Sequence, residues 1–297
     1  MTGGPTGWLL IDKPPGPTSA QVVGRLKRAL RQGGYGKVKI GHGGTLDPLA
    51  TGVLPVALGE ATKLAGYLLN GEKAYRFTVA FGTATATDDA EGDVVARSLI
   101  MPDAAAIAAI LPRFIGPIAQ VPPAYSALKV DGARAYALAR RGEAPVMAER
   151  AVTIHALNLL AADDGAASFE VFCSKGTYVR SLARDMALAL GSVGHVAMLR
   201  RIAAGPFHEA RAVPLDKCVE LVQGGALEQA LLPLTAGLDD IPALAVDPDQ
   251  ALALKQGKRL SGLRADPGHY IATLGPVPVA LVEVVQGDAI VVRGFNL

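Results

Sequence analysis

The 297-residue chain is long enough for about two domains, and its composition is that of a globular protein. Half of its residues are hydrophobic and 19% are charged, which excludes a disordered or fibrous chain. The longest apolar runs are too short to span a bilayer, and we see no secretory signal at the N-terminus. The two cysteines, Cys173 and Cys218, lie far apart in sequence, which favours a reducing cytoplasm over a disulfide scaffold.

The positive charge is unevenly distributed, although the net charge is only +2. Residues 1–44 contain seven basic side chains and one acidic side chain, and residues 171–201 contain five and one. Two basic segments of this kind are typical of a phosphate-binding surface. A solvated helix face explains the run at residues 25–31 equally well, so both interpretations stay open.

Hydrophobic periodicity predicts helices and strands in an irregular order along the chain. The predicted elements are a strand at 8–11, a helix capped by Thr18 or Ser19, a helix at 61–69, a strand at 74–81, a polar connection at 83–93, a helix from Asp103 to Leu111, an extended segment from 121, a helix at 133–141, strands at 151–160 and 167–174, a helix at 179–190 and a hairpin at 279–295. This mixed order favours an α+β fold, and the composition shifts near residues 234–248. We therefore expect a catalytic domain at 1–240 and a small β-rich domain at 241–297.

Residues 41–54 hold a single carboxylate, Asp47, among glycine, small and apolar residues. Pro48 disfavours the α conformation at Asp47, and the neighbouring glycines allow tight turns. A lone acid on such a loop is a candidate for covalent or acid/base chemistry. Asp followed by Pro is also the common sequence of a helix N-cap and first helical residue, although Gly52 would soon interrupt that helix. The two interpretations are compatible, since a cap would also hold the acid in place.

Five segments resemble, in order, the motifs of the bacterial tRNA pseudouridine synthase B family, whose members modify uridine 55 in the T loop of tRNA. The segments are residues 13–19, 41–54, 73–76, 175–185 and 199–201. Together they span roughly residues 8–207, which makes the resemblance far more specific than any single motif. The resemblance implies a mixed, mainly antiparallel sheet flanked by helices, followed by a small PUA-like RNA-binding domain.

The resemblance also implies roles for individual residues. Asp47 is the expected nucleophile and Arg180 its ion-pair partner, while Tyr75 is expected to stack on the flipped uracil. His42 is expected to help displace the target nucleotide from its stack. Three further residues complete the expected substrate-binding set: Tyr178, Leu199 and Lys13.

Taken without the resemblance, each of these side chains has an ordinary structural explanation. Tyr75, Tyr178 and Leu199 are typical core residues by pattern alone. Arg180 also fits an exposed helix arginine, and His42 a turn histidine that bonds the backbone. The expected chemistry is nevertheless consistent, because an arginine stays charged and opposes the rise in pKa that a dry pocket imposes on a carboxylate.

Two features depart from the family pattern. Gly43 occupies a position where the family usually has threonine, and the segment after about residue 241 matches the PUA pattern only faintly.

Pseudouridine formation is redox-neutral, so we expect no cofactor, and the spacing of the histidines and cysteines predicts no metal site. We expect the T stem-loop of tRNA as partner, no membrane, no obligate protein partner and a monomer in the cytoplasm. Two other functions stay open: a non-catalytic tRNA-binding folding chaperone, and an N-glycosidase that uses the same acid but releases uracil.

Overall fold

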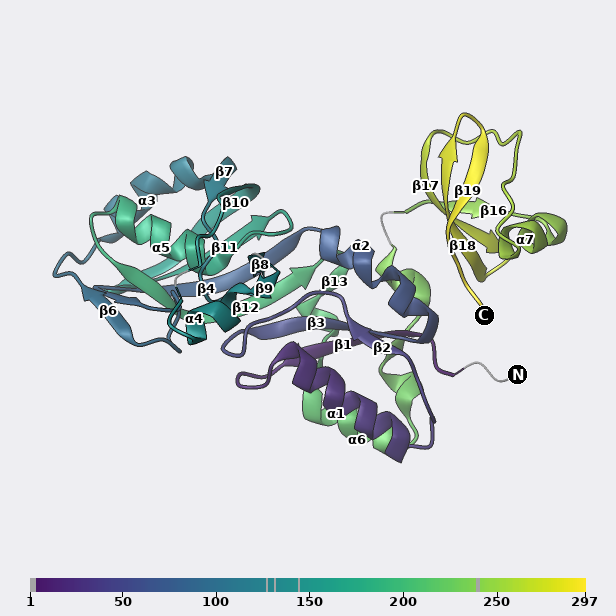
Figure 1. Cartoon of the computed structure of the whole chain (residues 1–297), viewed down its shortest axis with the longest axis horizontal. Coiled ribbons are helices and arrows are strands. Elements are labelled where there is room, and N and C mark those ends of the chain that lie inside the picture. Colours follow the sequence, from purple (N-terminus) through teal and green to yellow (C-terminus); the bar gives the residue numbers. More distant parts are fainter. Residues whose placement is uncertain (1–3, 127, 131, 144, 239–240) are drawn as a thin grey trace.

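The computed structural model describes residues 4–126, 128–130, 132–143, 145–238 and 241–297. Within them, eight strands form the path of one large sheet (Figure 1), in the order β14 (Val213–Pro214), β1 (Gly7–Lys13), β3 (Thr51–Leu58), β12 (Gly194–Ala204), β4 (Lys73–Phe81), β11 (Ala166–Cys173), β10 (Arg150–Asp163) and β7 (Gly116–Gln120). Three more strands pair along it: β2 (Ile40–His42) with β3, β13 (Phe207–His208) with β12, and β15 (Leu231–Leu232) with β1. The pairs β1–β14 and β3–β12 are parallel and the others antiparallel, which confirms the predicted mixed, mainly antiparallel sheet.

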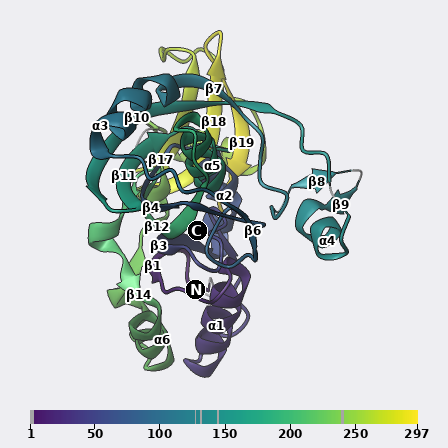
Figure 2. The same ribbon diagram turned by 90° about the vertical axis from the view of Figure 1, so that its left-hand side faces the viewer.

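Helices pack on the sheet through apolar stripes. The longest, α1 (Ser19–Gln32), buries Val22, Leu26 and Leu30, and Thr18 begins it in a reciprocal capping box with Gln21, as predicted. It lies beside α6 (Leu215–Gln223) below β1 and β3 in Figures 1 and 2, while α5 (Val179–Ala189) packs on β12 and α3 (Ala104–Ile110) on β10. The helix predicted at 61–69 is a short 3-10 helix, η1 (Gly59–Leu64), followed by α2 (Ala65–Asn70). The other short 3-10 helices are η2 (Leu111–Phe114), η3 (Glu209–Arg211), η4 (Leu227–Gln229) and η5 (Leu234–Gly237).

No helix begins at Asp47–Pro48, so the helix N-cap interpretation of this dipeptide is wrong. The chain instead enters β3 at Thr51, where Gly52 adopts φ +94° and a helix cannot continue. Neither β3 nor β12 is predicted from periodicity. β3 is apolar on both faces because it is covered on both sides, so the alternation that reveals a strand is absent.

Two segments extend from the main sheet. The connection predicted at 83–93 contains β5 (Thr83–Thr85), which pairs with β6 (Val94–Arg97). Figure 2 shows β8 (Lys129–Val130), β9 (Ala133–Arg134) and α4 (Ala135–Arg140) projecting away from the body. This second segment leaves the sheet after β7 and returns at β10.

The C-terminal region forms its own four-stranded sheet, which confirms a β-rich C-terminal domain. The strands are β16 (Ala243–Ala245), β17 (Gly268–Leu274), β18 (Val277–Val285) and β19 (Asp288–Gly294), and α7 (Pro248–Lys255) packs against them. The pair β18–β19 is the predicted hairpin. The predicted boundary at 240/241 adjoins residues 239–240, which lie outside the described part of the chain.

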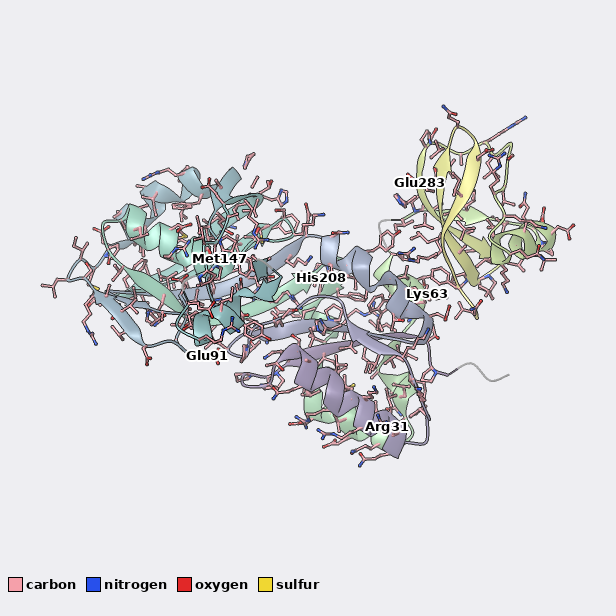
Figure 3. All side chains as sticks on the ribbon, in the orientation of Figure 1. Arg31, Lys63, Glu91, Met147, His208 and Glu283 are labelled. Carbon is pink, nitrogen blue, oxygen red and sulfur yellow. The ribbon has the colours of Figure 1, made fainter. Side chains whose placement is uncertain are left out.

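The C-terminal sheet contacts the main body near η1. Phe295 is buried in a cluster with Trp8 and Leu234 of the main body. Lys63, labelled in Figure 3, donates a hydrogen bond from Nζ to the carbonyl oxygen of Gly294 at 2.8 Å. None of the helices in the described ranges has the length and apolar character needed to cross a membrane.

Candidate active site

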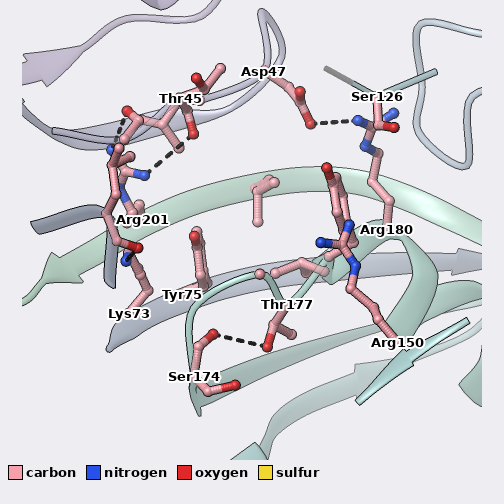
Figure 4. A pocket seen from close by; sticks show the side chains of 17 residues that line it. Thr45, Asp47, Lys73, Tyr75, Ser126, Arg150, Ser174, Thr177, Arg180 and Arg201 are labelled. Carbon is pink, nitrogen blue, oxygen red and sulfur yellow. Dashed lines mark hydrogen bonds and ion pairs between the residues drawn. The ribbon is translucent and has the colours of Figure 1, made fainter. Parts of the chain in front are cut away.

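A pocket of about 300 Å³ opens between the loop that carries Asp47 and the strands β4 and β12 (Figure 4). Five of the seven predicted site residues line it: Asp47, Tyr75, Tyr178, Arg180 and Leu199. These residues come from four segments far apart in sequence, which the fold brings together. The other two, His42 and Lys13, are not among its lining residues.

The Asp47 loop joins β2 to β3 and is held from below by the N-terminal motif. The hydroxyl of Ser19 accepts a hydrogen bond from the Leu46 N–H at 2.8 Å and lies 3.1 Å from the Leu46 carbonyl oxygen, to which it donates. The Gly16 N–H donates to the carbonyl oxygen of Pro48 at 2.9 Å. Both residues that flank Asp47 are therefore fixed through their backbones, which limits the positions open to the carboxylate.

Lys13 lies beneath the same loop and is fully buried. Its Nζ donates to the carbonyl oxygens of Pro14, Pro48 and Ala50 at 2.8, 3.1 and 2.7 Å. All three ammonium donors are thus used within the protein. Burial lowers the pKa of Lys13 to about 8, against the opposing effect of the nearby Asp47. The structure places Lys13 under the loop and not in the pocket.

Arg180 lies in the first turn of α5 and connects two carboxylates. Its Nη2 is 2.9 Å from Oδ2 of Asp47, and its Nη1 is 3.3 Å from Oδ2 of Asp89. The same guanidinium donates to the carbonyl oxygens of Thr87 and Tyr125. Arg180 and Asp89 are both buried, whereas the Asp47 side chain is 36% exposed and faces the pocket. The arrangement holds one pocket-facing carboxylate beside a permanent cation.

The charge of Asp47 depends on opposing effects. Burial raises the pKa of Asp47, the Arg180 guanidinium lowers it, and the Asp89 carboxylate raises it; the net direction is upward from the ordinary value of 3.8. Arg180 therefore stabilises the ionised form of Asp47 against the effect of burial.

Arg201 connects the Asp47 loop to the strand that carries Tyr75. It stands directly opposite Tyr75 in the register of β12 and β4, and it is almost fully buried. Its guanidinium donates to the carbonyl oxygens of Val53, Thr45 and Gly44 at 2.7, 3.4 and 3.3 Å. Burial raises the pKa of the Tyr75 phenol, with Arg201 opposing, so Tyr75 stays neutral. Its ring lines the pocket and also packs against the main core.

Tyr178 and Leu199 form another part of the pocket wall. Tyr178 directly precedes α5, and the side-chain amide of Gln120 accepts from its N–H at 3.0 Å and donates to its carbonyl oxygen at 3.1 Å. Leu199 is 7% exposed and belongs to the main core as well as to the lining. Leu199 therefore lies in the core and also lines the pocket.

A family model described as TruB family pseudouridylate synthase, N-terminal domain, matches residues 28–179, and a tRNA pseudouridylate synthase B C-terminal domain model matches residues 180–239. The chain belongs to the TruB pseudouridylate synthase family. Two similar family members are each named tRNA pseudouridine synthase B. The protein of Novosphingobium aromaticivorans is 57% identical, with 98% of this chain and 97% of the relative covered. The protein of Zymomonas mobilis subsp. mobilis is 53% identical, with 100% and 99% covered.

Solved structures agree with this assignment. A chain in an H/ACA RNP bound to a substrate RNA containing 2′-deoxyuridine matches with a TM-score of 0.75 and 25% identity, over 98% of this chain and 85% of that chain. A chain in a Cbf5–Nop10–Gar1 complex matches with a TM-score of 0.74 and 27% identity, over 98% and 84%. The predicted pseudouridine synthase-type fold is confirmed.

His42 and Gly43, at the start of the TruB-type loop, have distinct surroundings. His42 ends β2 opposite Val56, and burial, together with the charge of Arg201, lowers the pKa of its imidazole. Its Nδ1 is buried, and the imidazole lies close to the backbone of Gly44. A Cβ added to Gly43 would lie 2.8 Å from Cδ1 of Leu68, so glycine fits here where the family usually has threonine.

Four residues of this TruB-type site were not predicted to act there: Lys73, Asp89, Arg150 and Arg201. Lys73 and Arg201 lie within segments that resemble the family motifs. Their spacing in the sequence does not reveal a role, because their hydrogen-bond partners are backbone carbonyls. Asp89 falls in a segment predicted only as a polar connection, and no sequence pattern distinguishes it from its acidic neighbours. In the described ranges, no group of three or more His, Cys, Asp or Glu side chains is arranged to hold a metal ion.

Proposed function

We propose that this protein converts uridine 55 in the T loop of tRNA to pseudouridine, with Asp47 as the nucleophile. The observation that carries the proposal is the 2.9 Å contact between Arg180 and Asp47 at a pocket that Tyr75 also lines. Family membership and the names of the similar relatives, tRNA pseudouridine synthase B, support the reaction and the substrate class.

The reaction requires an extruded uridine, because the reacting atoms are inaccessible in a stacked base. The N1–C1′ bond breaks, the uracil rotates, a C5–C1′ bond forms, and the proton lost from C5 is balanced by one gained at N1. Asp47 attacks either uracil C6 or ribose C1′, and the Arg180 guanidinium keeps it ionised for that step. Tyr75 supplies a face on which the base stacks, worth about 1–3 kcal/mol.

Two predicted residues outside the pocket lining take supporting roles in this proposal. Lys13 positions the Asp47 loop through the Pro48 and Ala50 carbonyls, and does not contact the substrate. His42 lies at the start of the same loop, and in the complex with tRNA its side chain is expected to fill the space that the extruded base leaves.

A tritium-release assay tests the function. An unmodified tRNA transcript labelled at uracil C5 should release tritium to water, and the same transcript with cytidine at position 55 should not. A chaperone would release nothing from either transcript, and a glycosidase would free uracil and leave an abasic site. Release that persists from the cytidine-55 transcript would contradict the assignment of the position.

Asp47→Asn is the companion variant. We expect tritium release to fall by at least about a thousandfold, because the amide is not a nucleophile, while tRNA binding survives. The measurements are single-turnover tritium release and filter binding of the same transcript. Asp47→Asn with substantial turnover would exclude Asp47 as the nucleophile.

A further inference from the structure

One guanidinium that lines the pocket, that of Arg150, has two nitrogens without a hydrogen-bond partner among the described residues. Four cationic side chains line the pocket in the described ranges: Lys73, Arg150, Arg180 and Arg201. Lys73 and Arg201 donate to backbone carbonyls, and Arg180 pairs with carboxylates. Arg180 leaves only its Nε without a partner, whereas in Arg150 both Nε and Nη2 are shielded from solvent and neither has a hydrogen-bond partner in the described ranges.

The Arg150 guanidinium is nevertheless held in a defined position. Arg150 is the first residue of β10 and pairs in register with Gln120 of β7. The Gln120 side chain in turn holds the backbone of Tyr178, and the guanidinium carbon of Arg150 lies 4.8 Å from the centre of the Tyr178 ring. Figure 4 shows the guanidinium directed into the pocket, below Arg180. It is therefore preorganised by a strand end and a cation–π contact.

A charged group with buried, unpaired N–H donors is costly, so a partner that supplies acceptors should bind there. The planar donors of arginine match the oxygens of a phosphate, and charge-assisted hydrogen bonds of this kind are the strong ones. We propose that Arg150 binds a phosphodiester that flanks the flipped uridine. This inference rests on the proposed entry of that uridine into the pocket.

Phosphate is favoured over uracil as the ligand group of Arg150. The uracil must meet Asp47 and the Tyr75 ring, whereas Arg150 lies against the Tyr178 ring. A flipped nucleotide also brings negative charge beside its ribose, and the other lining cations of the described chain are already engaged. Arg150 thus supplies the free positive charge that this anion needs.

The first test compares Arg150→Ala and Arg150→Lys with a matched control, Arg76→Ala. Arg76 lies on the same sheet beside Tyr75, but its side chain is half-exposed and pairs with Glu170 and Glu209. Alternate residues of a strand face opposite ways, so Arg76 points away from the pocket. We expect kcat/KM on tRNA to fall roughly 10- to 100-fold for Arg150→Ala and less for Arg150→Lys, with the control near wild type. The slope of log K against log salt should also become shallower in Arg150→Ala, by the amount of about one phosphate contact, and should not change in the control.

The second test uses a T-arm RNA with a neutral methylphosphonate on either side of the target uridine. Wild-type enzyme should have a lower kcat/KM on one of these RNAs than on ordinary RNA. Arg150→Ala should have the same kcat/KM on both, because the contact is already missing. Equal further losses for wild type and variant, or an unchanged kcat/KM in Arg150→Ala, would overturn the phosphate contact. Thermal unfolding checks each variant, and Arg150→Lys carries the comparison if the alanine variant does not fold. Failure of the proposed function is distinct, because wild-type enzyme would then release no tritium from any RNA.

Discussion

The ionisation of Asp47 depends on two side chains that are buried behind it. Arg180 favours its ionised form, and Asp89, on the other side of Arg180, disfavours it. The guanidinium is thus shared, and Asp89 both fixes Arg180 in place and weakens its effect on Asp47. This arrangement makes separate predictions for the cation and for the second carboxylate.

Arg180→Ala should damage both folding and catalysis. The variant leaves the buried Asp89 without its ion-pair partner, and breaking a buried pair in this way costs about 3–5 kcal/mol of the free energy of unfolding. Denaturant unfolding and tritium release measure the two effects. Arg76→Ala, which breaks exposed pairs, should cost no more than about 1 kcal/mol. Near-normal turnover in Arg180→Ala would contradict the pairing with Asp47.

The pH profile should report the environment of Asp47. In the proposed mechanism the ionised carboxylate of Asp47 attacks. Because its pKa is raised, kcat/KM should fall as the pH falls through a value above 3.8. Asp89→Asn removes a negative charge that raises the pKa of Asp47, so the acid limb should move to lower pH. Glu170→Gln, on the exposed Arg76 pair, should leave the limb in place. A limb that moves upward in Asp89→Asn would contradict this electrostatic account.

At the level of elements, β12 joins the two sides of the site. It runs parallel to β3, where Arg201 meets Gly52, and antiparallel to β4, where the same Arg201 meets Tyr75. The Asp47 loop and the Tyr75 strand are therefore positioned by a single strand between them. The close approach of β3 to β12 depends on the glycine at position 52.

Gly52→Ala should strongly destabilise the protein. Gly52 adopts φ +94°, and an added Cβ would lie 2.2 Å from the carbonyl oxygen of Arg201, so strand backbone must move. We expect a loss of at least about 2 kcal/mol in denaturant unfolding. Gly24→Ala is the matched control, since Gly24 lies within α1 with open space around it, and it should stabilise by about 0.5–1 kcal/mol. Equal stability of the two variants would exclude the clash.

At the level of the whole molecule, folding removes part of the basic surface that the residue counts indicate. Of the seven basic side chains in residues 1–44, Lys13 is buried and Arg25 pairs with Asp216 on α6. Arg180 and Arg201 are also buried. The exposed cations of the N-terminal segment are Lys27, Arg28, Arg31, Lys37 and Lys39.

Binding of tRNA should weaken as the salt concentration increases. The weakening should be smaller than the number of basic residues in the sequence implies, because some of these residues are buried or paired. Each phosphate contact contributes a slope of about −0.7 to −0.9 in log K against log salt. Substituting Arg28 and Arg31 by glutamine should reduce the slope, whereas Lys13→Met should alter stability and leave the slope unchanged. Filter binding at several salt concentrations gives the slopes. An affinity that does not respond to salt would contradict a phosphate-binding surface.

Elements that depend on interactions between residues close in sequence were predictable. The cap at Thr18, the alternation from Tyr75 to Phe81 and the helical spacing after Tyr178 each act over a few residues, so the sequence pattern is enough to find α1, β4 and α5. The acid on a glycine-rich loop was likewise recognisable, because its constraint comes from its own neighbours.

Partnerships across long sequence separations were not predictable from the residues alone, and the Asp47–Arg180 pair was expected only from the family resemblance. Arg201 with the loop carbonyls, Arg180 with Asp89, and Lys13 beneath Pro48 join segments that only the sheet register brings together. Their partners are mostly backbone oxygens or ordinary acids, which carry no sequence signal. Residue type and spacing therefore indicate Asp47 as a candidate, while folding determines which cations hold its loop and its carboxylate, and which one keeps unpaired donors in the pocket.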